Sequence, residues 1–180
     1  MVPAPVKPLR RPADPPWETS RVPDLQPPTP EPLSLYGAFT ESSPLDWTWV
    51  DEQLGAAGTY WVIPRGLGHP HPRPVWGLWV DHGLHLSIGS PVVNRQITAE
   101  PSVTVHLDSG TEVVIVEGAV AGTTEAPGLI QRYDAKYDWT YTIAEYGPLT
   151  TVAPTVVMAW RSAGWAGREG VQAAGKWRFG

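Results

Sequence analysis

The chain has 180 residues, with 13 Lys and Arg against 18 Asp and Glu, for a formal net charge of −5. It has no cysteine, which excludes disulfides and thiolate metal sites and fits the reducing cytoplasm that we expect as its location. No apolar run is long enough to span a bilayer and no basic stripe is present, so we expect neither a membrane span nor nucleic-acid binding.

Proline is concentrated at the start of the chain, where residues 1–32 hold eleven of the 21 prolines. Proline has no backbone N–H to donate and disfavours both helices and strand ladders. We therefore predict a largely disordered, proline-rich arm over residues 1–42 and a single folded domain over residues 43–180. An arm that docks on a partner subunit is the alternative.

The first half of the predicted domain changes from helical to strand periodicity. A helix is predicted over residues 43–54, with Asp46 as its N-cap. Strands are predicted over residues 59–63, 73–80 and 84–88, where β-branched and aromatic residues alternate with other types. Asp81, His82 and Gly83 have the chemistry of a tight hairpin turn between the second and third of these strands.

The second half of the domain continues with short elements joined by turns. It contains predicted helices at residues 92–99 and 127–139, and predicted strands at residues 102–108, 112–120, 155–161 and 176–179. The total is about seven strands and three short helices. Hairpins between consecutive strands imply antiparallel pairing, so the pattern predicts a mainly β barrel or sandwich.

One string within this pattern is distinctive. From Gly68 to Asp81 the chain carries the arrangement G-x-P-H-x-x-P-V-W, which resembles the opening hairpin of the pyridoxamine 5′-phosphate oxidase-like split barrels. Residues 95–103, the pair Glu117 and Gly118, and residues 136–137 and 176–179 resemble later elements of the same family, so the resemblance covers about residues 45–180. It implies an antiparallel split β-barrel of six to eight strands with a few short helices, paired as a homodimer.

The resemblance also implies a cofactor, FMN or the deazaflavin coenzyme F-420, in a cleft at the dimer interface. The residues of this chain that it assigns to cofactor binding are Arg73, Pro74, Val75, Trp76, Ser87, Gly89, Ser90, Arg95, Gln96, Lys136, Trp177 and Arg178. Val92 and Val93 depart from the pattern, because many relatives carry Arg-Lys there for the phosphate. Losing two charge-assisted hydrogen bonds, at about 1.5–3 kcal/mol each, weakens a phosphate site about 100-fold or more.

The function that this resemblance implies is a flavin- or deazaflavin-dependent oxidoreductase acting on a small molecule that the sequence does not identify. No catalytic residue is named, because the ring of such a cofactor carries the reaction. The valines leave open a cofactor-free dimer that binds a small apolar ligand. A haem-binding protein, with His69, His71 or His85 as ligand, is a further alternative. No metal site is predicted, since His69 and His71 lack a third ligand nearby.

Overall fold

The computed structural model describes residues 28–31, 33, 43–66, 68–163 and 170–180. These residues form four helices and ten strands, more strands than the six to eight expected. In chain order they are β1 (Thr29–Glu31), β2 (Ser43–Pro44), α1 (Trp47–Ala56), β3 (Tyr60–Pro64), β4 (Arg73–Val75), β5 (Gly77–Val80), β6 (Gly83–Leu86), α2 (Pro91–Ala99), β7 (Ser102–His106), β8 (Glu112–Thr124), α3 (Pro127–Tyr137), α4 (Ile143–Tyr146), β9 (Leu149–Ser162) and β10 (Val171–Arg178).

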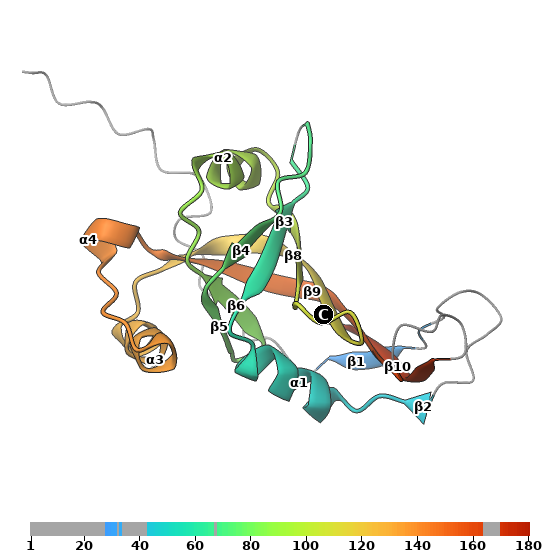
Figure 1. Ribbon diagram of the computed structural model, residues 1–180. Helices are drawn as coiled ribbons and strands as arrows, with labels where there is room; N and C mark the ends of the chain where they lie inside the picture. The colour runs from blue at the N-terminus through green and yellow to red at the C-terminus, as the bar shows by residue number, and fades with distance from the viewer. Residues whose placement is uncertain (1–27, 32, 34–42, 67, 164–169) are drawn as a thin grey trace, which may run out of the picture.

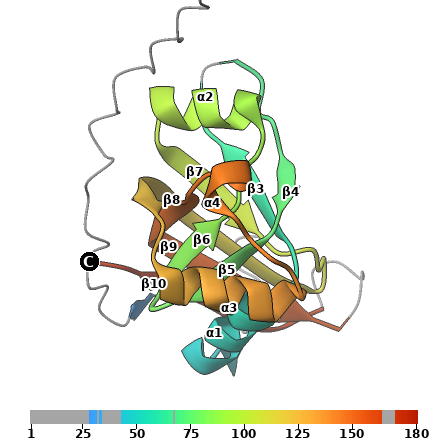
Figure 2. The ribbon, with the colours of Figure 1, turned by 90° about the vertical axis from the view of Figure 1, so that its left-hand side faces the viewer.

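All ten strands belong to one sheet, in which every pair except β2–β10 is antiparallel. Its central path runs β1-β10-β9-β8-β7-β3-β4, and β6 joins β9 to β5. The long strand β9 pairs with β8 along one edge, whereas its other edge pairs with β6 near its start and with β10 further on. Figures 1 and 2 show α1 and α2 at opposite ends of the curved sheet and α3 and α4 together on one side. The predicted mainly β, antiparallel architecture is confirmed.

The first helix follows the predicted capping chemistry. The Asp46 carboxylate accepts the backbone N–H of Thr48 at 2.8 Å, as an N-cap side chain does. Val50 and Leu54 lie one turn apart and are buried in the main apolar cluster inside the barrel. A helix with one apolar side thus closes one end of the sheet.

The strand predicted over residues 73–80 is divided in the structure. β4 pairs with β3 and β5 pairs with β6, and Trp76 between them belongs to neither strand. At Trp76 the chain changes from pairing with β3 to pairing with β6. The alternation of residue types along the sequence does not indicate such a change. The turn after β5 is the predicted tight one: Asp81 and His82 both have positive φ, 50° and 60°, as a two-residue type I′ turn requires.

The start of β9 was predicted six residues too late. The strand begins at Leu149, and Pro154 lies within it opposite Gly118, where the register of β8 shifts. A proline in a central strand is tolerated at such a bulge because the ladder is interrupted there. The two-residue and three-residue strands β2 and β1, and the single-turn helix α4, were not predicted.

Part of the predicted arm pairs with the domain. Residues 1–27, 32 and 34–42 lie outside the described residues, but Thr29–Glu31 forms β1 on the outer edge of β10. Glu31 makes salt bridges with Lys176 at 3.0 Å and with Arg178 at 2.8 Å. Hydrogen bonds from these two cations, that of Arg178 foremost, lower the pKa of the Glu31 carboxyl to about 2.

Among the buried polar side chains, His85 of β6 gives a prediction on pH dependence. Its Nδ1 lies 3.1 Å from Thr151 Oγ1, and burial lowers its pKa below the ordinary value of 6.5. Below pH 6.5 the unfolded chain therefore binds more protons than the folded one. The free energy of unfolding consequently decreases as the pH is lowered. For one group the slope is at most about 1.4 kcal/mol per pH unit.

We expect urea denaturation to show lower stability at about pH 5.5 than at about pH 7.5, and His85→Gln to flatten this difference. An unchanged pH dependence in the variant would show that other groups cause it.

Candidate functional site

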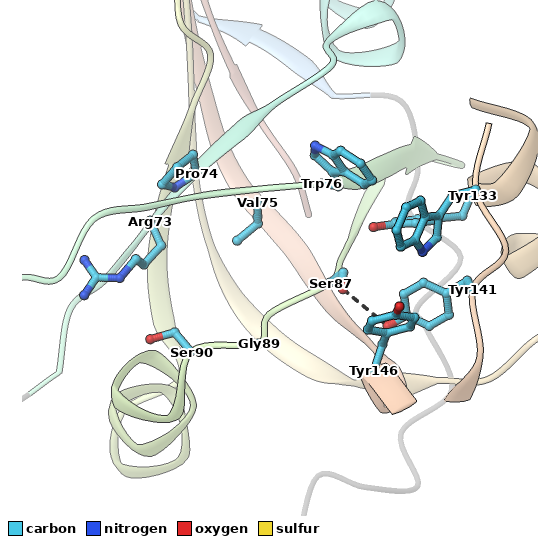
Figure 3. A pocket seen from close by; sticks show the side chains of 11 residues that line it. Arg73, Pro74, Val75, Trp76, Ser87, Gly89, Ser90, Tyr133, Tyr141 and Tyr146 are labelled. Carbon is cyan, nitrogen blue, oxygen red and sulfur yellow. Dashed lines mark hydrogen bonds between the residues drawn. The ribbon is translucent and has the colours of Figure 1, made fainter. Parts of the chain in front are cut away.

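A surface cavity of about 470 Å³ lies where β4, the β6–α2 loop and the α3–α4 region meet. This volume is within the usual range for small-molecule sites. The lining residues are Arg73, Pro74, Val75, Trp76, Ser87, Gly89, Ser90, Tyr133, Trp139, Tyr141 and Tyr146. The first seven are among the twelve residues predicted to bind a cofactor, and they come together here from two separate segments (Figure 3).

One end of the cavity is suited to an anion. Arg73 is exposed there, and its hydrogen bond within the described chain is to the carbonyl of Pro72 at 2.8 Å. Ser90 lies at the same end and is the N-cap of α2 (Figure 3). The N-terminus of a helix carries a partial positive charge and attracts anions. Among the described residues that line the cavity, Arg73 is the one with an ionic side chain.

Val92 and Val93 occupy the first turn of α2, as the sequence predicts, but they do not line the cavity. Val93 is fully buried in the main apolar cluster, so its role is to pack the helix onto the barrel. A basic side chain at this position would leave a charge in the core, which costs several kcal/mol. The anion end therefore depends on Arg73, Ser90 and the helix terminus.

The middle of the cavity carries hydroxyl groups. Ser87 Oγ lies 3.3 Å from Tyr141 Oη, and the Tyr141 hydroxyl donates to the carbonyl of Gly147 at 3.0 Å. Tyr133 of α3 is 3% exposed and lines the same space. Burial raises the pKa of Tyr133 to about 12, against a smaller opposing effect of a hydrogen bond with Ser87. Its phenol is therefore a protonated donor at neutral pH.

Aromatic rings form the other end of the cavity. Trp76 is stacked on Tyr137, with ring centroids 4.6 Å apart and planes at 3°, and meets the edge of Trp139 at 5.9 Å. Tyr146 follows at 6.2 Å from Trp139. We call Trp76, Trp139 and Tyr146 the aromatic rim.

The backbone under the rim is held by side chains of α3. The Tyr137 hydroxyl accepts the N–H of Gly77 and donates to the carbonyl of Gly77, both at 2.9 Å. Lys136 Nζ donates to the same carbonyl at 3.1 Å and to Tyr60 Oη at 3.2 Å. Burial lowers the pKa of Lys136 to about 8. Lys136 thus lies behind the cavity wall and holds the backbone at the junction between β4 and β5.

The hydrogen bonds between the Tyr137 hydroxyl and the backbone of Gly77 predict that Tyr137→Phe lowers stability. The variant leaves the buried N–H of Gly77 without its acceptor, which costs about 1–3 kcal/mol of unfolding free energy. Urea denaturation measures the loss, and Tyr146→Phe is the matched control because that side chain is exposed. Equal stability of both variants would show that the Tyr137 hydroxyl does not hold the strand break.

The remaining predicted cofactor residues lie elsewhere and do not line the cavity. Arg95 is on the exposed side of α2, and Gln96 is buried with its Nε2 donating to the carbonyl of His69 at 3.1 Å. Trp177 is buried in the barrel core, with its ring 5.4 Å from that of Trp47. Arg178 pairs with Glu31 of β1.

The sequence interpretation missed Tyr133, Trp139, Tyr141 and Tyr146, which form much of the wall. Residues 133–146 hold five aromatic side chains, and this density is the signal in the sequence that marks the segment. The end of the helix at Tyr137, before a left-handed Asp138, turns Trp139 away from the line of α3.

The histidines considered as haem ligands, His69, His71 and His85, do not line the cavity. Within the described residues no group of three or more metal-binding side chains occurs. Nor does any helix of the described chain have the length and apolarity to cross a membrane.

No protein-family model matches the chain, and no curated protein does. Among solved structures, a conserved hypothetical protein from Mycobacterium tuberculosis matches with a TM-score of 0.53 and 17% identity, over 67% of this chain and 88% of that one. A protein of the pyridoxinephosphate oxidase family related to general stress protein 26, from Clostridium acetobutylicum, matches with a TM-score of 0.50 and 11% identity, over 65% and 91%.

An F-420 reductase matches with a TM-score of 0.48 and 19% identity, over 59% of this chain and 94% of that one. The first two structures, with TM-scores of 0.53 and 0.50, share the fold of this chain. Together with the sheet order, they identify the architecture predicted from the Gly68–Asp81 string. The chain has the antiparallel split-barrel fold of the pyridoxamine 5′-phosphate oxidase-like proteins.

Proposed function

We propose that the chain binds a flavin-type cofactor, FMN or coenzyme F-420, in the cavity beside Trp76, and serves as an oxidoreductase for a small molecule. The observation that carries the proposal is the layout of the cavity, with an anion end at Arg73 and aromatic rings at the other end. A molecule with a phosphate and a flat ring system matches both ends. The split-barrel fold, shared with a member of the pyridoxinephosphate oxidase family, supports it.

The residues of the cavity fit such a group. Arg73, Ser90 and the N-terminal amides of α2 would hold the phosphate, and Val75, Ser87 and Gly89 would flank the chain and the ring. When bound, the cofactor supplies a two-electron, hydride-transferring ring. The protein would place the substrate against that ring, and Tyr133, whose phenol is protonated at neutral pH, lines the same space.

Titration of the purified protein with FMN and with F-420, followed by absorbance and fluorescence, tests the proposal. We expect saturable binding of at least one cofactor, and oxidation of its reduced form when a suitable acceptor is added. Failure of both cofactors to bind at millimolar concentration overturns it.

A second function is favoured by one observation, that Arg73 alone is ionic among the lining residues in the described part of the chain. A cavity with a single cation and a largely aromatic wall also suits a small apolar ligand held without a cofactor. Mass spectrometry under native conditions separates the two proposals, because a retained apolar ligand on protein that takes up neither cofactor supports the second.

The proposal includes pairing as a homodimer. Sedimentation velocity measures the state in solution, and a monomer at micromolar concentration contradicts this part alone.

A further inference from the structure

Lys136 carries a half-buried positive charge that no carboxylate compensates within the described part of the chain. Its Nζ donates to the Gly77 carbonyl at 3.1 Å and to the Tyr60 hydroxyl at 3.2 Å. The same atom lies 5.0 Å from the ring centroid of Tyr60 and 5.4 Å from that of Tyr137. A buried charge without a counter-ion is costly, so such a group is a candidate for a functional role.

The carboxylates of α1 and α3 have other partners or are open to solvent. Asp51 of α1 accepts the indole N–H of Trp79 at 2.7 Å, and Asp134 of α3 accepts a backbone N–H at 2.7 Å. The other charged side chains on these helices and directly after α3 are exposed, namely those of Glu52, Arg132 and Asp138. The charge of Lys136 is therefore held by neutral groups alone: a carbonyl, a hydroxyl and two rings.

The phenols around Lys136 do not change charge near neutral pH. Burial raises the pKa of Tyr60 and of Tyr137 above the ordinary value, and that of Tyr133 to about 12. β5 contributes no ionisable side chain. Burial acts in the opposite direction on Lys136 and lowers its pKa to about 8, because the ammonium is the charged form. Among the groups in this contact, Lys136 is thus the one that titrates between about pH 7 and pH 9.

The carbonyl that Lys136 holds belongs to the junction between β4 and β5, which positions Trp76. The Trp76 carbonyl accepts the backbone N–H of Ser87 at 2.9 Å, and the Gly77 carbonyl accepts both Lys136 and Tyr137. Gly77 lies so close to β6 that an added Cβ would be 2.8 Å from a carbonyl oxygen of that strand. The Trp76 ring, stacked on Tyr137, lines the cavity directly beside this junction.

We propose that Lys136 is a positioning residue for the cofactor: its ammonium holds the Gly77 carbonyl and thereby sets Trp76 in the orientation that receives the flat ring. The inference rests on the proposed function, which places a flavin-type ring beside Trp76. Loss of the proton removes the charge from both hydrogen bonds and both ring contacts, and charge-assisted hydrogen bonds are about twice as strong as neutral ones. The deprotonated protein holds the junction less firmly and binds the cofactor more weakly.

The direction of the pH effect follows from this preference. Because cofactor binding favours the protonated amine, affinity is full below the pKa of Lys136, which is about 8, and falls above it. We expect FMN or F-420 to bind about tenfold more weakly at pH 9 than at pH 7, since only the protonated fraction is competent. Fluorescence titration at constant ionic strength measures the dissociation constant at each pH. Titration of the cofactor itself is common to all variants, so their comparison removes it.

Three variants assign the effect to Lys136. Lys136→Met keeps the length of the side chain without its charge, and should bind about tenfold more weakly at pH 7, with no further loss at pH 9. Lys136→Arg stays charged throughout and should retain affinity at pH 9. Arg132→Met is the matched control, because it removes the same charge from an exposed position of the same helix. It should leave affinity and pH profile within about twofold of native.

A measurement without cofactor tests the movement of Trp76 directly. Tryptophan emission of the native protein should change with a midpoint near pH 8, the pKa of Lys136, and this change should be absent from Trp76→Phe and from Lys136→Met. If Lys136→Met does not fold, the native protein and Trp76→Phe still decide the outcome.

The same pH dependence of cofactor affinity in the native protein and in Lys136→Met overturns the inference and leaves the proposed function standing. Native affinity of Lys136→Met at pH 7, or an emission change that persists in Trp76→Phe, does the same. Failure of the native protein to bind FMN or F-420 at any pH overturns the proposed function, and the inference with it.

Discussion

Replacing Arg73 with alanine is expected to weaken binding of FMN or F-420 about 10- to 100-fold. The Arg73 guanidinium is the one ionic group that the described residues contribute to the cavity lining, and a charge-assisted hydrogen bond to phosphate contributes about 1.5–3 kcal/mol. Fluorescence titration of the variant measures the change in dissociation constant. The difference in affinity between the variant and the native protein should be smaller at high salt, because salt screens the attraction between Arg73 and the phosphate in the native protein.

Arg95→Ala is the matched control for this experiment. Arg95 is exposed on α2 and outside the lining, so its removal should leave cofactor affinity within about twofold of native. An equal loss of cofactor affinity in both variants would show that Arg95 belongs to the phosphate site, as the sequence resemblance implies. No loss in Arg73→Ala would contradict the position of the anion end.

Gly118→Ala is expected to have the largest effect on folding. A Cβ at Gly118 would lie 2.4 Å from the carbonyl oxygen of Ala153 in the neighbouring strand. Relief of that overlap requires the β8–β9 pair to separate at the bulge opposite Pro154, and overpacking against backbone costs about 3 kcal/mol, the upper end of the usual range. Thermal and urea denaturation measure the loss.

Gly55→Ala provides the comparison. Gly55 lies in α1, and an added Cβ there meets nothing within 4 Å. Because alanine favours helix by about 1 kcal/mol over glycine, this variant should be as stable as the native protein or more stable. Similar stability of the two variants would show that β8 and β9 adjust at the bulge without strain.

Much of the fold could be predicted because it depends on local chemistry. Asp46 caps α1, alternating residues form β3, β7 and β8, and Asp81 with His82 makes the type I′ turn. Where the prediction was wrong, a distant contact decides the local structure. The strand over residues 73–80 breaks because its two parts pair with different neighbours, and Pro154 is accepted because the β8–β9 ladder is interrupted at the bulge opposite it.

The candidate site was predictable only in part, for a related reason. The segments Arg73–Val75 and Ser87–Ser90 carry residues that the family resemblance assigns, and both line the cavity. The residues of α3 and α4 that line the cavity match no such motif. Their sequence does not reveal their role, because tyrosine and tryptophan at those positions suit a buried core equally well. Exposure distinguishes the two roles, and exposure depends on which face of α3 packs against β5.

The sequence by itself determined that the chain forms antiparallel strands joined by tight turns, because residue alternation and turn chemistry act over a few neighbouring positions. It also determined that the first turn of α2 carries no basic side chain, since Val92 and Val93 are read directly from the chain. Only the tertiary structure decided that Arg73, Ser90 and the aromatic rim share one cavity. These residues are separated by up to about seventy positions, and packing of Lys136 and Tyr137 against Gly77 brings them together.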